Sequence, residues 1–143
     1  MADSNNINIS APNIVSICID RISDREKQGR LYHCYRQEPI IFQNEHQMIS
    51  QMEDFMNGLN YPQASNQIRS FHPEEKHTPK AEMHPVVDKD QIVQMRGELA
   101  TFIIHVQYRQ KATWQGKVIH AETGEPQEFL SMMELLKIMD NTI

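Results

Sequence analysis

One pattern occurs twice in this chain, as QGRLYHCYRQEPIIF at residues 28–42 and as QGKVIHAETGEPQEF at residues 115–129. The two copies lie 87 positions apart and align without a gap. The alignment extends to residues 15–53 and 102–140, where eight of 39 pairs are identical. Similarity at a fixed offset is typical of a duplicated structural unit, because each unit alone leaves an apolar face that its twin can cover. We therefore interpret the chain as two copies of one unit; two unrelated strand–helix segments are the alternative.

Each copy shows the pattern of three strands followed by a helix. Apolar residues alternate at 15–19 and again at 102–108, which is typical of a half-buried strand. A polar segment containing a glycine separates this run from a second strand, and a tight turn leads to a short third strand that ends at Phe42 or Phe129. The unit is therefore predicted to be βββα.

A helix is predicted to begin directly after the third strand of each copy. Two pairs of residues have the spacing of a capping box, namely Asn44 with Gln47 and Ser131 with Glu134. Apolar residues follow at helical spacing, so we expect helices near 44–58 and 131–141. The sequence thus predicts an α+β fold in which internally duplicated βββα units form a pseudo-twofold antiparallel sheet with two helices on one face.

The two units are expected to form one compact domain with a long connection between them. Residues 11–60 form the first βββα unit and residues 92–143 the second. Residues 61–91 carry four of the seven prolines, which predicts a Pro-rich linker that is partly disordered, around 72–90, and dispensable for folding. Residues 1–10 are polar and predict a disordered tail.

Composition and charge limit the kind of partner. The chain has 143 residues, is 39% hydrophobic and carries a net charge of -5. This acidic balance argues against direct nucleic-acid binding, which uses basic surfaces, and against an anionic membrane. The chain shows neither a membrane-spanning apolar run nor a signal peptide, so we expect a cytoplasmic location. Cys18 and Cys34 lack metal-binding spacing and are predicted to be buried free thiols.

Histidines occur in two settings. His72, His77 and His84 lie among carboxylates in the linker, but they lack the i, i+4 spacing of helical zinc ligands, so no metal site and no cofactor are predicted. His33 and His120 occupy matching positions of the two copies. Such a pair is a candidate ligand-contacting or pH-responsive site. The alternative is that each histidine is satisfied by a neighbour on its own strand.

The first hairpin of the second copy is the candidate binding surface. It concentrates the aromatic, guanidinium and amide groups of Tyr108, Arg109, Gln110, Trp114 and Gln115. Tyrosine, tryptophan and arginine dominate the hot spots of protein interfaces. The matching segment of the first copy, 21–28, is charged and has no aromatic residue. We therefore predict that this hairpin contacts a partner; the alternative is that its tryptophan turns inward and packs.

The sequence carries no catalytic signature. It has no GxSxG, P-loop, HExxH or zinc-deaminase motif, and His33 and Cys34 are strand neighbours that face opposite sides. We therefore expect a protein that is not an enzyme but a cytoplasmic adaptor or regulatory protein, acting through protein–protein binding and able to form a homodimer. Two alternatives stay open. One is a small acidic inhibitor or antitoxin-like protein that blocks a nucleic-acid enzyme, and the other is a small-ligand sensor that uses His33 and His120.

The segment LATFIIHVQYRQKATWQGKVIHAETGEPQEFLSMMELLKIMD spans residues 99–140. Its TWQG hairpin at 113–116 and the Phe-x-Ser-x-x-Glu-Leu helix start at 129–135 resemble those of a group of small bacterial proteins of gut Firmicutes. The stretches GRLYHCY and NYPQASNQIRSF of the first half are similar to that group as well. The resemblance implies no particular activity. In outline the βββα unit is also similar to HicB-type antitoxins, which is a likeness of fold alone.

Overall fold

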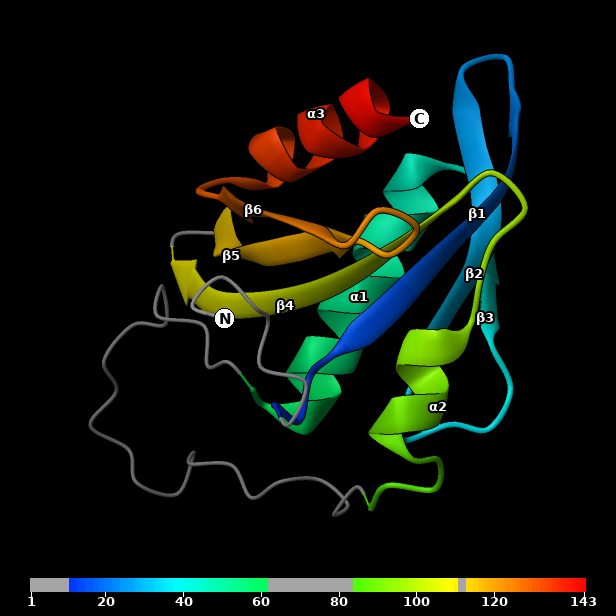
Figure 1. The fold of residues 1–143 in the computed structure, drawn as a ribbon. Helices are drawn as coiled ribbons and strands as arrows, with labels where there is room; N and C mark the ends of the chain where they lie inside the picture. The colour runs from blue at the N-terminus through cyan, green and yellow to red at the C-terminus, as the bar shows by residue number, and fades with distance from the viewer. Residues whose placement is uncertain (1–10, 62–83, 111–112) are drawn as a thin grey trace.

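The computed structural model describes residues 11–61, 84–110 and 113–143 of the chain. These residues form one six-stranded antiparallel sheet and three helices, so the predicted α+β class is confirmed (Figure 1). In chain order the elements are β1 (Val15–Ser23), β2 (Glu26–His33), β3 (Ile40–Phe42), α1 (Glu45–Leu59), α2 (Lys89–Gln94), β4 (Ala100–Gln110), β5 (Thr113–His120), β6 (Glu125–Phe129) and α3 (Met132–Thr142).

The first strands of the two halves meet at the centre of the sheet. The strand order is β3-β2-β1-β4-β5-β6, so β3 and β6 form the two edges. In the central seam, Ser16 of β1 lies opposite Ile103 of β4, and the strands run antiparallel. Figure 1 shows β1 and β4 side by side, with α1 crossing behind them. The seam joins segments that are far apart in the sequence, so neither half completes the sheet alone.

The two hairpins have the same strand register. Ile19 pairs with Gly29 in the β1–β2 hairpin, and Val106 pairs with Gly116 in the β4–β5 hairpin. The register shifts by one residue directly after each of these pairs, which marks a β-bulge. Each position of the second hairpin lies 87 residues after its counterpart in the first. The offset seen in the sequence therefore also relates the strand pairings.

Both glycines stand where the neighbouring strand comes too close for a side chain. A Cβ atom on Gly29 would lie 1.9 Å from the carbonyl oxygen of Cys18, and one on Gly116 would lie 2.1 Å from that of His105. Real Cβ atoms do not approach a backbone oxygen so closely, so the pairing next to each bulge requires a residue without a Cβ.

The main core lies between the sheet and the helices α1 and α3, which cover one face. The helices contribute Met48, Met52, Phe55, Met56, Leu135 and Met139, and the central strands contribute alternate residues such as Ile17, Leu31, Phe102 and Val118. All of these side chains are nearly inaccessible to solvent. The helices predicted near 44–58 and 131–141 are therefore confirmed, and they share a face of the sheet.

Side-chain caps start both of these helices, as the sequence predicts. Asn44 Oδ1 accepts a hydrogen bond from the Gln47 amide at 2.8 Å, and Ser131 Oγ accepts one from the Glu134 amide at 3.0 Å. The return bonds reach one residue beyond the cap, because Gln47 and Glu134 accept from the backbone N–H groups of residues 43 and 130. Each helix thus has a fixed first turn directly after its third strand.

α2 covers part of the opposite face of the sheet, which the predicted arrangement of two helices on one face does not include. Ile92 of α2 is 1% exposed, and its carbonyl oxygen accepts a hydrogen bond from Ser16 Oγ of β1 at 2.8 Å. The predicted arrangement therefore lacks this third helix, which covers β1. A six-residue helix with one fully buried apolar residue has too little periodicity to be recognised from sequence.

The predicted linker, 61–91, overlaps the start of α2. The amides of Val86 and Val87 both donate to the carbonyl oxygen of Cys34, at 2.7 and 3.1 Å, and so attach this part of the chain to the end of β2. Of the segment expected to be partly disordered, 72–90, residues 84–90 lie within the described part of the chain. The expected tail 1–10 and residues 62–83 lie outside the described part of the chain.

Candidate functional site

The β4–β5 hairpin does not present the surface predicted from its sequence. Trp114 is 1% exposed and Arg109 is 4% exposed. The two residues pair across the hairpin, and Trp114 belongs to the core between the sheet and the helices. The expectation that both are exposed is therefore corrected. Trp114 alternates with Val118 on β5 and faces the helices, and the bulge in β4 turns Arg109 toward the same face.

Arg109 connects the second hairpin to α1 of the first half. Its Nη1 donates to Asn57 Oδ1 at 2.8 Å and lies 3.4 Å from Glu53 Oε2. Burial lowers the pKa of the guanidinium, and the nearby Glu53 carboxylate opposes that effect. Arg109 is thus held inside the molecule by polar contacts of its own and is not available to a partner in this conformation.

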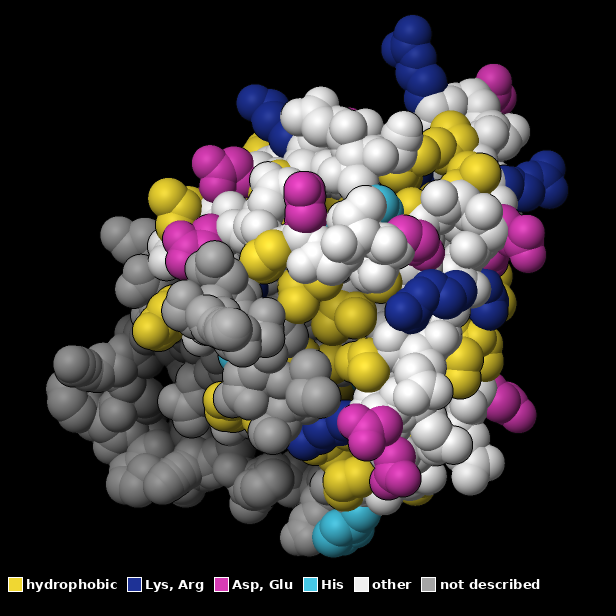
Figure 2. Space-filling view, in the orientation of Figure 1, with side chains coloured by type: hydrophobic (Ala, Val, Ile, Leu, Met, Phe, Trp, Pro, Cys, Tyr) yellow, Lys and Arg dark blue, Asp and Glu magenta, His cyan; other side chains and the backbone are white. Residues whose placement is uncertain are grey.

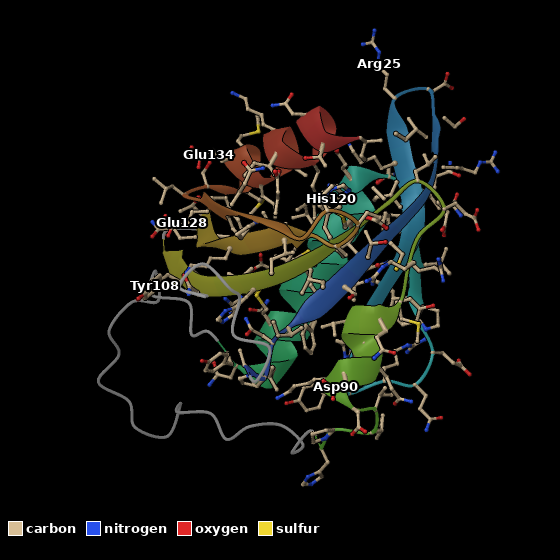
Figure 3. All side chains as sticks on the ribbon, in the orientation of Figure 1. Arg25, Asp90, Tyr108, His120, Glu128 and Glu134 are labelled. Carbon is tan, nitrogen blue, oxygen red and sulfur yellow. The ribbon has the colours of Figure 1, made fainter. Side chains whose placement is uncertain are left out.

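The remaining residues of the predicted surface differ in exposure. Tyr108 is 62% exposed, and Figure 3 shows it pointing away from the body of the molecule. Gln115 is half-buried, and the side chain of Gln110 lies outside the described part. A binding role for these residues stays a prediction, with Tyr108 as the exposed member of the set.

His33 and His120 share a face of the sheet but do not come together. His33 pairs with Val15 on β1, and His120 pairs with Phe102 on β4. Val15 and Phe102 are not cross-strand partners of each other in the β1–β4 pairing. Strands β1 and β4 lie between the two imidazoles. Three strand spacings amount to roughly 14 Å. The paired-histidine site considered from the sequence is therefore not formed.

His120 is satisfied locally, by residues of the turn that follows its strand and not by a neighbour on the strand itself. Its Nδ1 lies 2.9 Å from Thr123 Oγ1, and its Nε2 lies 3.2 Å from Glu122 Oε1. Both partners belong to the turn between β5 and β6. This imidazole therefore orders a turn at the surface.

His33 has a different environment at the end of β2. Its ring is 6% exposed and stacks on Phe55 of α1, with centroids 4.0 Å apart and planes 8° from parallel. Its Nδ1 accepts a hydrogen bond from the Tyr35 amide at 3.1 Å. Burial, with a smaller contribution from Arg36, lowers the pKa of His33 to about 4. The ring is therefore neutral at pH 7, and the bond to Nδ1 leaves the proton on Nε2.

A cavity of 460 Å³ opens beside this imidazole, between β2, β3 and α1. It is termed the His33 cavity, and its lining comprises His33, Tyr35, Arg36, Ile40, Gln51, Asp54, Phe55 and Gly58. The last four residues lie at i, i+3, i+4 and i+7 on α1, which places them along one face of the helix. The cavity thus combines aromatic and aliphatic side chains with two opposite charges.

One polar group in this lining has no hydrogen-bond partner in the described part of the chain. Gln51 Nε2 donates to the carbonyl oxygen of Ile41 at 3.1 Å, which fixes the amide against β3. The Oε1 atom is buried, and among the described residues nothing donates a hydrogen bond to it. Buried acceptors are normally paired, so this atom calls for an explanation. The sequence offered no signal for it, because Gln51 reads as an ordinary solvent-facing helix residue.

The turn from β6 into α3 exposes apolar side chains beside acidic ones. Leu130 is 62% exposed and Met133 is 65% exposed. Glu128 of β6 and Glu134 of α3 point outward at the same corner of the molecule (Figure 3). Figure 2 shows hydrophobic and acidic side chains side by side at the upper left, where Figure 1 places this turn. These four residues are termed the β6–α3 surface.

Sequence reasoning did not identify this surface, although a signal was present. Met133 lies in the first turn of α3, off the buried stripe that includes Leu135 and Met139. An apolar residue off the buried stripe of an amphipathic helix faces solvent, and so Met133 marks an exposed apolar position. Leu130 precedes the helix and lacks a comparable pattern.

The described residues hold no evident centre for metal or thiol chemistry. Across 11–61, 84–110 and 113–143, no three His, Cys, Asp or Glu side chains gather as metal ligands. Cys18 and Cys34 are buried free thiols, as predicted, and burial raises the pKa of Cys18 to about 11. A thiol with so high a pKa is a poor nucleophile at neutral pH. None of the helices in these ranges is long and apolar enough to cross a membrane.

Comparison of the chain with family models, curated proteins and solved structures finds no match. The resemblance to the gut Firmicutes group therefore stays an expectation from the sequence.

Proposed function

We propose that the protein is an internal duplication of a βββα unit with pseudo-twofold symmetry. The common 87-residue offset of strand pairs, bulges, close-approach glycines and helix caps supports this interpretation. A twofold axis through the Ser16–Ile103 pair would exchange the pair Val15–Ile104 with the pair Ile17–Phe102, and both pairs occur in the seam. Differences between the halves then indicate where each half acquired its own role.

We further infer that the protein is a non-catalytic, cytoplasmic adaptor or regulatory protein that binds another protein through the β6–α3 surface. One observation carries this proposal. At two matched positions around the helix start, the first half has Gln43 and His46, whereas the second half has Leu130 and Met133. Both apolar side chains are more than half exposed. Exposed apolar area is stabilised when a partner removes it from water, and methionine adapts well to binding surfaces.

The neighbours of these side chains indicate the chemistry of the partner. Leu130 occupies the position before the helix cap, from which an apolar residue often packs onto the first turn, but its 62% exposure leaves it open. Glu128 and Glu134 flank it, and β6 is an edge strand that can pair with an extended segment. A segment with an apolar side chain between lysine or arginine residues would complement this surface. The free thiols of Cys18 and Cys34 support a reducing, cytoplasmic location.

The chain itself supplies the variant that tests this proposal. Leu130→Gln combined with Met133→His gives the second half the residues of the first half at these positions. Both side chains are exposed, so the thermal midpoint should change by no more than a few degrees. Affinity capture from native lysate should lose the specific partner with this variant and keep it with Ile22→Gln, a matched change at another exposed apolar residue. Recovery of the same proteins by the double variant as by the unchanged chain would contradict the proposed surface.

The acidic side chains of the same surface favour a second candidate, an acidic inhibitor of a nucleic-acid enzyme. The response to salt separates the two candidates. Raising the ionic strength from about 0.05 to about 0.5 M should weaken a charge-mimicking complex steeply and an apolar contact little. If the partner is a second copy of this chain, sedimentation velocity should show a dimer that Leu130→Gln with Met133→His dissociates.

A further inference from the structure

We propose that the His33 cavity binds a free aromatic α-amino acid whose ring carries a hydrogen-bond donor, such as tryptophan or tyrosine. The cavity shares no residue with the β6–α3 surface, so this site goes beyond the proposed protein-binding function. Its volume of 460 Å³ lies in the range of roughly 300 to 1,000 Å³ that is usual for small-molecule sites.

The walls of the cavity suit a flat apolar group. His33 and Phe55 form a parallel stack 4.0 Å apart, and Tyr35 is tilted against both rings at centroid distances of 6.1 and 5.9 Å. Ile40 of β3 adds an aliphatic side chain to the lining. A ligand ring gains offset or edge contacts with such a cluster in addition to the burial of its surface.

An unpaired polar atom in the lining selects the kind of ring. Gln51 Oε1 is a buried acceptor to which no described residue donates a hydrogen bond. An indole N–H or a phenol O–H can satisfy the Gln51 acceptor, whereas a plain phenyl ring leaves it unpaired. The cavity therefore favours tryptophan or tyrosine over phenylalanine.

The charged side chains select the other end of the ligand. Arg36 and Asp54 are both exposed members of the lining and carry opposite charges. A free α-amino acid presents a carboxylate and an ammonium group on neighbouring atoms, and so it can pair with both side chains. A nucleotide would bring phosphate charge toward Asp54 on a chain of net charge -5, which disfavours that class.

The second half lacks the residues that build this cavity. Glu122 and Thr142 stand at the positions that match Tyr35 and Phe55, and Ile138 stands where the first half has Gln51. The aromatic walls and the unpaired acceptor are thus confined to one half. This asymmetry is expected of a ligand site added to a framework that needs neither feature for its fold.

The test is a titration of the full chain with L-tryptophan at pH 7. Binding is measured by calorimetry and by ligand-observed saturation-transfer NMR. We expect saturable binding of one equivalent. L-phenylalanine should bind roughly tenfold more weakly, because it leaves the Gln51 acceptor unpaired. N-acetyl-L-tryptophanamide, which lacks both charges, should also bind roughly tenfold more weakly.

Three variants locate the site. Gly58→Leu adds a side chain to the lining of the cavity and replaces a helical glycine by a stronger helix former, and so binding should be lost while the helix is no less stable. Arg36→Gln and Asp54→Asn should each weaken binding several-fold without affecting stability, since both side chains are exposed. Arg25→Gln, at the remote tip of the first hairpin, is the matched control and should bind as the unchanged chain does (Figure 3).

Several results would overturn the proposal. These are the absence of saturable tryptophan binding up to its solubility, binding by N-acetyl-L-tryptophanamide as tight as that of tryptophan, or saturation by adenosine in its place. Unchanged affinity in a folded Gly58→Leu variant would show that the ligand binds elsewhere, and it would also overturn the proposal. If Gly58→Leu does not fold, unchanged affinity in both charge variants is decisive against the site.

Discussion

At the scale of single residues, Lys27 and Trp114 show how one backbone position accepts opposite chemistries. They lie 87 positions apart at matching points of the two hairpins, and they are 3% and 1% exposed. Trp114 fills the core, whereas the Lys27 ammonium donates hydrogen bonds to Glu45 and Asp140. Lysine and arginine are normally assigned to the surface, so sequence reasoning missed the burial of Lys27 and Arg109. The alternation of Lys27 with Gly29 and Leu31 was the available signal.

The buried imidazole of His33 makes stability depend on pH. Its pKa falls from 6.5 to about 4 on folding, because burial and Arg36 disfavour the charged form. Between pH 4 and pH 6.5, the His33 imidazole binds a proton in the unfolded chain but not in the folded one. The contribution of His33 is therefore fully present above pH 6.5 and is lost as the pH falls toward 4. We expect protonation of His33 to lower the free energy of unfolding by about 2 to 3 kcal/mol as the pH falls across this window.

Urea unfolding at pH 7 and at pH 4.5 measures this effect. His33→Gln lacks the titrating group, so its loss of stability between the two pH values should be smaller than that of the unchanged chain. The carboxylates common to both proteins cancel in this comparison. Equal losses in the two proteins would show that His33 is protonated as easily in the folded chain as in the unfolded one.

At the scale of elements, the pairing of each hairpin depends on its glycine. Gly29→Ala and Gly116→Ala would each place a Cβ about 2 Å from a carbonyl oxygen of the adjacent strand, so the strand must move. We expect each substitution to cost about 2 to 3 kcal/mol of unfolding free energy, measured by urea denaturation. Near-equal costs at the two positions are expected from the matching geometry.

Gly124→Ala is the control for this prediction. Gly124 has a φ of +77° but no atom within 4 Å of its added Cβ, so the cost is that of backbone conformation alone. About 1 kcal/mol is expected there. If Gly116→Ala cost no more than Gly124→Ala, the close approach of the strands at the bulge would not be a constraint in solution.

The elements were largely predictable, whereas their surfaces were not. Strand alternation, the turn residues and the caps at Asn44 and Ser131 are local signals, and they placed both βββα runs and both long helices. The helix α2 was missed because six residues with a single buried side chain show no period. The burial of Arg109 was missed because the bulge in β4 shifts which residues face the core, whereas the alternation of Trp114 with Val118 on β5 indicated a tryptophan that faces inward. The His33 cavity depends on contacts between β2, β3 and α1 that local patterns do not contain.

At the scale of the whole molecule, buried cations tie the two halves together. Lys27 of the first half contacts Asp140 of α3, and Arg109 of the second half contacts Glu53 of α1. Asp140 and Glu53 are matching residues of the two helices. Each hairpin thus contacts the helix of the other half, although the cation sits on a different strand in the two cases.

The ion pairs of Lys27 give a prediction for the contact between the two halves of the chain. Burial alone would lower the pKa of Lys27, but its hydrogen bonds to Asp140 and Glu45 outweigh that effect and raise it. Glu45→Gln combined with Asp140→Asn leaves a buried ammonium without a carboxylate. We expect this double change to cost roughly 3 kcal/mol of unfolding free energy, measured by chemical denaturation.

A rescue experiment separates this cause from a general loss of helix stability. Adding Lys27→Met to the double variant removes the unpaired charge and keeps most of the volume, so stability should return to within about 1 kcal/mol of the original. If the triple variant is no more stable than the double variant, the carboxylates act on their helices and not through Lys27.

The central seam has a consequence for how the chain folds. Each hairpin closes over a short turn, but the partners in the β1–β4 seam are about 87 positions apart, so the seam carries most of the loop-closure entropy. The hairpins are therefore expected to form early and the seam late, as the rate-limiting step. Until it closes, each half exposes an inner edge that is complementary to the other. Two chains that meet at that moment can exchange halves, so concentrated refolding should favour a domain-swapped dimer over the monomer.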